Sequence, residues 1–281
     1  MKPPRFEYEA PETVEQAIGL LAELGDEAKV LAGGQSFVPM LNLRLARPGT
    51  VVDIRKLPLG YLRVDDEQLR VGALVKHKQL ETDPLVAAAA NVYAQAAPHI
   101  GYISIRNRGT FGGSLAHADS TAEISLCSLA MGATVIARST QGEREIPIEE
   151  FFLGPFTTAL EPEELLTEAR VPRMTAGDRH GFAELARRSG DFALAAAAVV
   201  IPRDEGDIRI SVVGPGPTPQ LVVLPRSAKL ANQSDLEGLA DEAVAELGGM
   251  NESMSDLEKR SAKAVVVDAL MKATNGGEEQ R

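Results

Sequence analysis

Two glycine pairs, each close to an apolar stretch, constrain this chain more than any other feature of its sequence. The first lies in VLAGGQSFVP, residues 30–39, and the second in RNRGTFGGSLAHAD, residues 106–119. Adjacent glycines let the backbone approach a ligand closely, and the N–H groups of such a turn can point at phosphate oxygens. Ser36, Thr110 and Ser114 would add hydroxyl donors. If the two turns meet, they can hold the two phosphates of a dinucleotide without lysine side chains, although either pair alone is also a common turn filler.

The usual signatures of other nucleotide sites are absent from the sequence. There is no GxxxxGK[ST] phosphate loop. The nearest approach to GxGxxG is GPGPTP at residues 214–219, where prolines remove amides that the motif needs. This segment is interpreted as a rigid turn, and a Rossmann cofactor site is not expected.

Composition narrows the class of protein. A chain of 281 residues that is 44% hydrophobic can bury a core and form two domains. Its net charge of −11 makes nucleic acid and anionic membranes poor partners, and no apolar stretch approaches membrane-spanning length. The single cysteine, Cys127, excludes an internal disulfide and a cluster held by four thiolates of this chain. The four histidines show no metal-ligand spacing, so no metal site is expected, and a cytoplasmic location fits.

The first region, residues 1–173, is predicted to mix helices and strands. Thr13 and Gln16 form a capping box at the start of an amphipathic helix that ends near Gly25. A second capping box, Ser120 with Glu123, starts another helix. Further elements are predicted at residues 29–34, 50–57, 69–75 and 133–139 as strands and at 84–100 and 120–132 as helices.

A polar, glycine-containing connection at residues 174–181 is the predicted domain boundary. The second region, residues 174–281, is predicted to be a smaller α+β domain in which strands precede helices. Its strands are expected in FAELARR, FALAAAAVVI and DIRISVVG, and its helices at residues 235–247 and 255–274.

Three segments together resemble one family. They are LAGGQSFVPMLNLRLARPGTVVDIRKL, HIGYISIRNRGTFGGSLAHADSTAE and ELARRSGDFALAA, which cover residues 31–57, 99–123 and 184–196. In this order they resemble the FAD-binding medium subunit of the molybdenum hydroxylases. That family includes the medium chain of carbon monoxide dehydrogenase and the flavin subunits of xanthine and heteroaromatic dehydrogenases. The resemblance extends over nearly the whole chain.

The resemblance implies an α+β fold and a non-covalent FAD site. Residues 1–173 would form an FAD-binding domain of the vanillyl-alcohol-oxidase (PCMH-like) type, and residues 174–281 the C-terminal domain of carbon monoxide dehydrogenase flavoproteins. The residues that match the family's motifs are Ala32, Gly33, Gly34, Gln35 and Ser36 in a first diphosphate cradle, Thr110, Phe111, Gly112, Gly113 and Ser114 in a second, Ile100 and Gly101 against the cofactor, Glu123 at the adenosine ribose, and Leu166 and residues 182–192 with Phe192 at the isoalloxazine ring. Valine at Gly33 or Gly112 is expected to abolish FAD binding while leaving the fold largely intact.

Several of these residues allow two interpretations. Glu123 is either a ribose ligand or part of the helix cap, and Phe192 either stacks on the flavin or belongs to the core of a strand. This sequence departs from the family's pattern at Ala183 and Glu184, because many relatives have a lysine in the segment before ARR. A cationic contact with FAD from this segment is therefore in doubt.

The charged and histidine side chains near the motifs also allow two interpretations each. His117 and Asp119 are either an acid–base pair or residues that shape the glycine turn. His77 is either packed and neutral or in contact with the cofactor. Arg187 and Arg188 form either an exposed basic patch or a cationic contact beside the flavin.

The function implied by the resemblance is electron transfer within a heterotrimer. A small subunit would hold two [2Fe–2S] clusters, a large subunit a molybdopterin centre, and this chain an FAD that passes electrons to NAD, a quinone or oxygen. The assembly would be a dimer of heterotrimers. One alternative is a stand-alone FAD-dependent oxidase or reductase on the same fold, which would need a substrate acid or base. Another is a scaffold subunit that has lost its flavin. The paired glycines argue against this alternative, because without a ligand alanine would be more stable at these positions.

Overall fold

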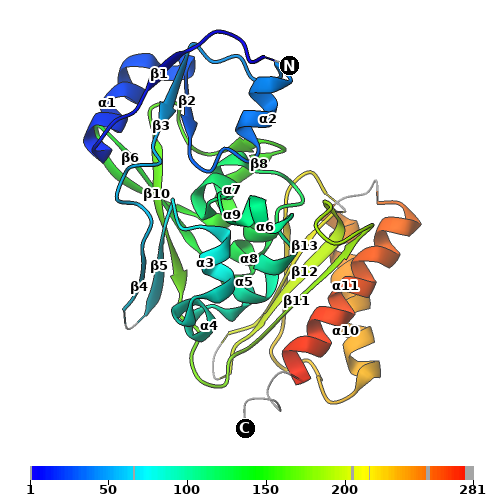
Figure 1. Ribbon diagram of the computed structural model, residues 1–281. Helices are drawn as coiled ribbons and strands as arrows, with labels where there is room; N and C mark the ends of the chain where they lie inside the picture. The colour runs from blue at the N-terminus through cyan, green and yellow to red at the C-terminus, as the bar shows by residue number, and fades with distance from the viewer. Residues whose placement is uncertain (1, 66, 204–205, 215, 251–253, 276–281) are drawn as a thin grey trace.

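The computed structural model of the protein describes residues 2–65, 67–203, 206–214, 216–250 and 254–275. Within these ranges the strands form a three-stranded, a five-stranded, a four-stranded and a two-stranded sheet (Figure 1). Helices and sheets are mixed in the first part of the chain and segregated in the last, so the predicted α+β class is confirmed. None of the helices in these ranges has the length and apolar character needed to cross a bilayer.

The first sheet is parallel and carries the first glycine turn at one strand end. In spatial order it consists of β1 (Glu7–Glu9), β3 (Thr50–Asp53) and β2 (Ala28–Leu31). Helix α1 (Val14–Leu24) contacts β2 and β3. Its predicted capping box is confirmed, because the Thr13 hydroxyl accepts from Gln16 N at 3.2 Å and the Gln16 side chain accepts from Thr13 N at 3.3 Å. A short helix, α2 (Phe37–Asn42), follows the glycine turn.

The second sheet is antiparallel, and several of the helices that follow β5 in the chain contact it. In spatial order it consists of β4 (Leu62–Val64), β5 (Gln68–Gly72), β10 (Leu165–Pro172), β6 (Thr134–Ser139) and β7 (Gly142–Pro147). The nearby helices are α3 (His77–Thr82), α4 (Pro84–Ala89), α5 (Asn91–Ala96), α6 (Ile103–Arg106), α7 (Phe111–His117), α8 (Glu123–Met131) and α9 (Ile148–Phe151).

Two helix predictions in this region need correction. The single helix expected over residues 84–100 is interrupted at Ala90, a fully buried residue with φ −159°, and ends in a 3-10 turn over Ala97–His99. The segment around the second glycine pair, expected to be a turn, is the start of helix α7. Gly132 ends α8 in the left-handed region, at φ 64°, as predicted.

The third sheet is antiparallel and belongs to the last part of the chain. Its strands are β11 (Arg179–Ala186), β12 (Ala193–Ile201), β13 (Ile208–Val213) and β14 (Gln220–Leu224), of which β14 was not predicted. Figure 1 shows α10 (Gln233–Met250) and α11 (Asp256–Asn275) side by side on one face, while α5 and α8 contact the other face. Alternation along β11 directs Phe182 towards α5 and α8 and Ala183 towards α11.

A hairpin of β8 (Phe152–Gly154) and β9 (Thr157–Thr158) lies beside α7. The first glycine turn, helix α7 and the turn between β11 and β12 border one cavity. This arrangement positions the site described next.

Candidate functional site

A cavity of about 680 Å³ is lined by residues of both glycine-containing segments and of the turn between β11 and β12. All of the residues that the sequence analysis assigned individually line it, except Phe111, whereas of the segment 182–192 only residues 190–192 do. Phe111, the first residue of α7, is fully buried in the core, with its ring 5.5 Å from the ring of Tyr93. The lining residues selected from the sequence are Ala32, Gly33, Gly34, Gln35, Ser36, Ile100, Gly101, Thr110, Gly112, Gly113, Ser114, Glu123, Leu166 and Phe192.

The two glycine-containing segments meet backbone to backbone, as the sequence led us to expect. A Cβ atom placed on Gly33 would lie 2.5 Å from Arg108 O and 2.8 Å from Gly109 Cα. These distances are too short for any side chain, because the opposing atoms belong to the backbone and cannot rotate away. Glycine at position 33 is therefore needed to bring the turns together.

The first glycine turn has backbone N–H groups that donate to no acceptor within the described residues. Among the described residues, no acceptor bonds to the backbone N–H groups of Gly33, Gly34, Gln35 and Ser36. Gly34 adopts φ 73°, a conformation that favours glycine, and the Gln35 side chain donates to Gly33 O at 3.0 Å. All four residues line the cavity, and backbone N–H groups without an acceptor are suited to bind an anionic ligand such as a phosphate.

The second glycine pair has a different role from the one we predicted. Phe111 N donates to Val75 O at 2.8 Å, and Gly112 N donates to Ala73 O at 3.0 Å. These amides connect α7 to the segment that follows β5, so they are already used within the protein. The prediction of a second cradle built from free amides is therefore wrong for Phe111 and Gly112.

Thr110 is the N-cap of helix α7. Its hydroxyl accepts from Gly113 N at 3.1 Å, and its carbonyl accepts from Ser114 N at 2.9 Å. The Thr110 side chain thus holds the glycine pair at the start of the helix rather than acting as a spare donor. The hydroxyl of Ser114, one turn into the helix, lines the cavity.

Replacing Thr110 by alanine is expected to lower the free energy of unfolding by about 1 kcal/mol, because one helix N–H group loses its acceptor. For a chain of this size the melting temperature should fall by about 2–4 °C, measured by thermal unfolding. Thr110→Ser keeps the hydroxyl and should melt like the parent. An equal fall in both variants would mean that the cap does not contribute.

Glu123 is the first residue of helix α8, and the predicted capping box with Ser120 is wrong. The N-cap is Ala122, which has no capping side chain. The Glu123 side chain lines the cavity. Burial, and then the negative charges of Glu184 and Asp119, raise the pKa of Glu123 to about 8. The carboxyl therefore retains a proton at neutral pH.

This raised pKa predicts a pH-dependent difference between the chain and its Glu123→Gln variant. The pKa of this carboxyl is higher in the folded than in the unfolded state. Its contribution to stability is therefore complete when the pH is below the unfolded-state pKa, and it is lost as the pH rises through about 8. The parent should therefore lose stability relative to Glu123→Gln between about pH 5 and pH 9. Thermal unfolding of both chains at the two pH values measures this, and a constant difference would contradict it.

His77 is packed and neutral, and it also borders the cavity. Its Nε2 lies 3.0 Å from Thr110 O, and its Nδ1 is buried. Burial lowers the pKa of His77 to about 4, which keeps the ring uncharged at neutral pH. The ring fills the space beside Gly109, where an added Cβ would lie 3.1 Å from it.

His117 and Asp119 line the cavity, but each has its own partner. The Asp119 carboxylate accepts from Thr121 N at 2.8 Å and from the Thr121 hydroxyl at 2.7 Å, and so shapes the turn that precedes α8. The ring of His117 lies 5.0 Å from that of Phe156 in the β8–β9 hairpin. Burial lowers the pKa of His117. These contacts favour a role in shaping the turn over an acid–base pair.

The third sheet closes one end of the cavity through the turn between β11 and β12. Gly190 in this turn has φ 83°, and a Cβ on it would lie 3.1 Å from Gly101 C and O. Phe192 follows with 78% of its surface exposed, so it is not a core residue of β12. Arg187 and Arg188 are exposed and do not line the cavity, in agreement with an exposed basic pair.

Other residues that line the cavity were not selected from the sequence. They include Lys29 on β2 and several acidic or apolar residues that precede β10. Lys29 is the first residue of the strand that was predicted to lead into the glycine turn, and this position was a usable signal. The residues before β10 had none, since they reach the cavity only through the pairing of β10 with β5 and β6. They are Leu160, Glu161, Pro162 and Glu164.

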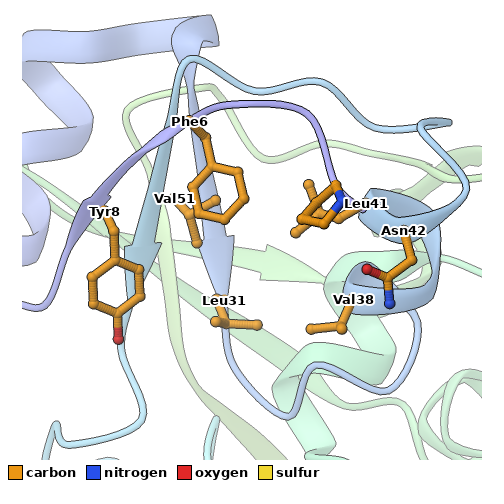
Figure 2. Close-up of a pocket in the computed structure, with 8 residues that line it drawn as sticks. Phe6, Tyr8, Leu31, Val38, Leu41, Asn42 and Val51 are labelled. Carbon is orange, nitrogen blue, oxygen red and sulfur yellow. The ribbon is translucent and has the colours of Figure 1, made fainter. Parts of the chain in front are cut away.

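A second, smaller cavity of about 150 Å³ lies between β1, β2, β3 and α2. Figure 2 shows the side chains that line it. Apolar side chains such as Phe6, Leu31 and Val51 line it, with the Asn42 amide at one edge. Its lining residues differ from those of the larger cavity. The larger cavity, with its unpaired N–H groups, is therefore the candidate functional site.

Comparison with known proteins gives consistent matches. Residues 4–174 match the family described as the FAD binding domain in molybdopterin dehydrogenase. The chain is 44% identical over 223 residues to the alpha subunit of the 6-hydroxypseudooxynicotine dehydrogenase complex of Paenarthrobacter nicotinovorans, which covers 78% of this chain and 75% of that one. It is 36% identical over 272 residues to the carbon monoxide dehydrogenase medium chain of Hydrogenophaga pseudoflava, covering 94% of both.

The fold matches a solved structure from the same organism. Carbon monoxide dehydrogenase from Hydrogenophaga pseudoflava, in a form that lacks the Mo-pyranopterin moiety, superposes with a TM-score of 0.88 at 35% identity. The match covers 98% of this chain and 99% of that chain, and so extends through the third sheet and its helices.

Proposed function

Because the chain belongs to the family described as the FAD binding domain in molybdopterin dehydrogenase, we propose that it is the FAD-binding medium subunit of a molybdenum-containing hydroxylase. In this role the chain receives electrons from [2Fe–2S] clusters of a small partner subunit and delivers them to an external acceptor such as NAD, a quinone or oxygen. Substrate is oxidised at a molybdopterin centre in a large partner subunit. When bound, FAD supplies the redox chemistry, since a flavin exchanges electrons singly or in pairs.

The observation that carries this proposal is the row of unpaired N–H groups at the junction of the two glycine-containing segments. The residues fit a diphosphate, because Gly33 to Ser36 offer donors that the protein leaves unused and Ser114 offers a hydroxyl nearby. Lys29, which lines the same cavity and precedes this turn on β2, adds a positive charge. We assign the FAD diphosphate to this wall.

We assign the isoalloxazine ring to the end of the cavity that the third sheet closes. Ile100 and Gly101 lie there beside Gly190, and Phe192 is free to cover one face of the ring. We assign Glu123, which lines the same cavity, to the adenosine ribose, as its place in the family's motif implies.

We further propose the finer features that accompany this role. The chain divides into an FAD-binding domain over residues 1–173 and a C-terminal domain over residues 174–281. It assembles with its two partner subunits as a dimer of heterotrimers. A cytoplasmic location is supported by Cys127, which is a free and fully buried thiol.

Purification of the chain together with the products of its neighbouring genes tests the proposal. The complex should show flavin absorbance with one FAD for each copy of this chain, and iron and molybdenum should co-purify with it. A chain that purifies alone and oxidises a small substrate by itself would instead support the stand-alone enzyme. A complex without flavin, even after incubation with FAD, would support the scaffold.

A further inference from the structure

The loop that follows helix α2 exposes two leucines in a fixed conformation. Leu43 is 57% exposed and Leu45 is 72% exposed. Arg44, between them, adopts φ 60°, in which an arginine is less stable than a glycine. Arg44 N donates to Leu41 O at 3.0 Å and Leu45 N donates to Met40 O at 2.9 Å, which is the hydrogen-bond pattern of a Schellman helix end. The backbone is therefore held so that both leucines face solvent.

The leucines border the small cavity between α2 and the first sheet. Asn42, the residue before Leu43, lines that cavity, and so do Val38 and Tyr8, which are themselves exposed. Figure 2 shows Phe6 and Val38 on either side of the cavity. An apolar cavity of about 150 Å³ holds one group of the size of benzene. Exposed apolar side chains thus surround a pocket for one bulky apolar group.

The same surface is positively charged, although the whole chain carries a net charge of −11. Lys2, Arg5, Arg44 and Arg47 are exposed, and among the described residues no carboxylate forms an ion pair with any of them. Nε of Arg44 donates to Lys2 O at 3.3 Å, and Nε of Arg47 donates to Arg44 O at 3.2 Å. These bonds place the N-terminal segment beside the loop, so the four cations gather on one side of the small cavity's lining.

The carboxylates of the neighbouring segments do not neutralise these cations. Glu7 and Glu9 alternate with the cavity-lining residues of β1, and so their side chains point to the opposite face of the sheet. Glu27 is near the end of the loop, since a Cβ on Gly49 would lie 2.5 Å from its Oε2, but it forms no ion pair with Arg47 within the described ranges. The surface therefore keeps a surplus of positive charge.

We propose that a partner subunit of the complex docks on this surface through an acidic segment that carries one bulky apolar side chain. We call it the α2 surface, formed by the small cavity with Leu43 and Leu45 and by the four cations. The apolar side chain enters the cavity and the leucines cover it, while carboxylates of the partner pair with Arg44 and Arg47. An apolar centre with a charged rim is the usual arrangement of a protein interface. The inference rests on the proposed function, because it takes the partner from the same complex.

The single cysteine of the chain makes a labelling test possible. Cys127 is fully buried, so Leu45→Cys introduces the one accessible thiol. The variant is treated with a water-soluble maleimide, alone and in the assembled complex, and the mass of this chain reports the label. We expect labelling in the complex to be slower at least about 10-fold, because the centre of an interface excludes water. Leu257→Cys on α11, where the leucine is 67% exposed, is the matched control and should react equally in both states.

A second measurement separates docking from folding. Leu45→Ser changes an exposed side chain, so the isolated chain should melt like the parent. The dissociation constant of the complex should rise at least about 10-fold, which is about 1.4 kcal/mol. Neither Leu45 nor Arg44 lines the larger cavity, so FAD content should not change. Replacing Arg44 and Arg47 by glutamine should reduce the dependence of the dissociation constant on salt concentration.

Equal labelling of Leu45→Cys alone and in the complex would overturn the inference, and so would parental affinity in Leu45→Ser. Slow labelling of the isolated chain, together with a dimeric mass in solution, would show that a second copy of this chain covers the α2 surface, which also contradicts the proposal. Failure of the parent to assemble with partner subunits at all would instead refute the proposed function.

Discussion

Replacement of Gly33 by alanine is expected to lower the affinity for FAD on the order of 100-fold. The added methyl group would lie 2.5 Å from Arg108 O and 2.8 Å from Gly109 Cα, so the two segments must separate. Separation displaces the unpaired N–H groups of the first turn from the diphosphate. Overpacking of this kind costs about 1–3 kcal/mol, and about 2.8 kcal/mol corresponds to a 100-fold loss of affinity.

Quenching of FAD fluorescence on titration with the purified chain measures this affinity. Because both segments are loops at the point of contact, the variant should keep its circular dichroism spectrum. Gly19→Ala is the matched control, since a Cβ on Gly19 of α1 meets nothing within 4 Å. The control should bind FAD normally. Parental affinity in Gly33→Ala would show that the junction of the segments does not hold the cofactor.

Replacement of Gly112 by valine is expected to disrupt the fold as well as the site. A Cβ on Gly112 would lie 2.6 Å from Ala73 Cβ and 2.7 Å from Ala73 Cα. Helix α7 would have to move away from the segment after β5 and lose the hydrogen bonds of Phe111 N and Gly112 N. At a cost of about 3 kcal/mol, the melting temperature should fall on the order of 10 °C. This differs from the sequence-based expectation that the fold survives.

Thermal unfolding of the FAD-free chain measures the effect without the contribution of the cofactor. Gly238→Val in α10 introduces the same side chain where a Cβ meets nothing within 4 Å, and should change the melting temperature little. If Gly112→Val melts like the parent but no longer binds FAD, position 112 contacts the cofactor and does not support the fold.

The two variants separate roles that looked identical in the sequence. Both glycine pairs follow apolar residues and both have hydroxyl side chains beside them. In the structure Gly33 allows two loops to meet, whereas Gly112 lies inside a helix and allows that helix to pack on Ala73. The pattern correctly indicated that side chains are excluded at both positions. It did not show whether a ligand or the protein itself occupies the space.

The sequence by itself determined the features that depend on near neighbours. The Thr13–Gln16 capping box, the end of α8 at Gly132 and the alternation along β11 follow from residues a few positions apart, so their signals are local. The tertiary structure decided which groups remain unpaired. The N–H groups of residues 33–36 meet no acceptor among the described residues, and burial of Glu123 by the fold raises the pKa of its carboxyl to about 8. Burial and charge depend on residues distant in the chain, so no local pattern specifies them.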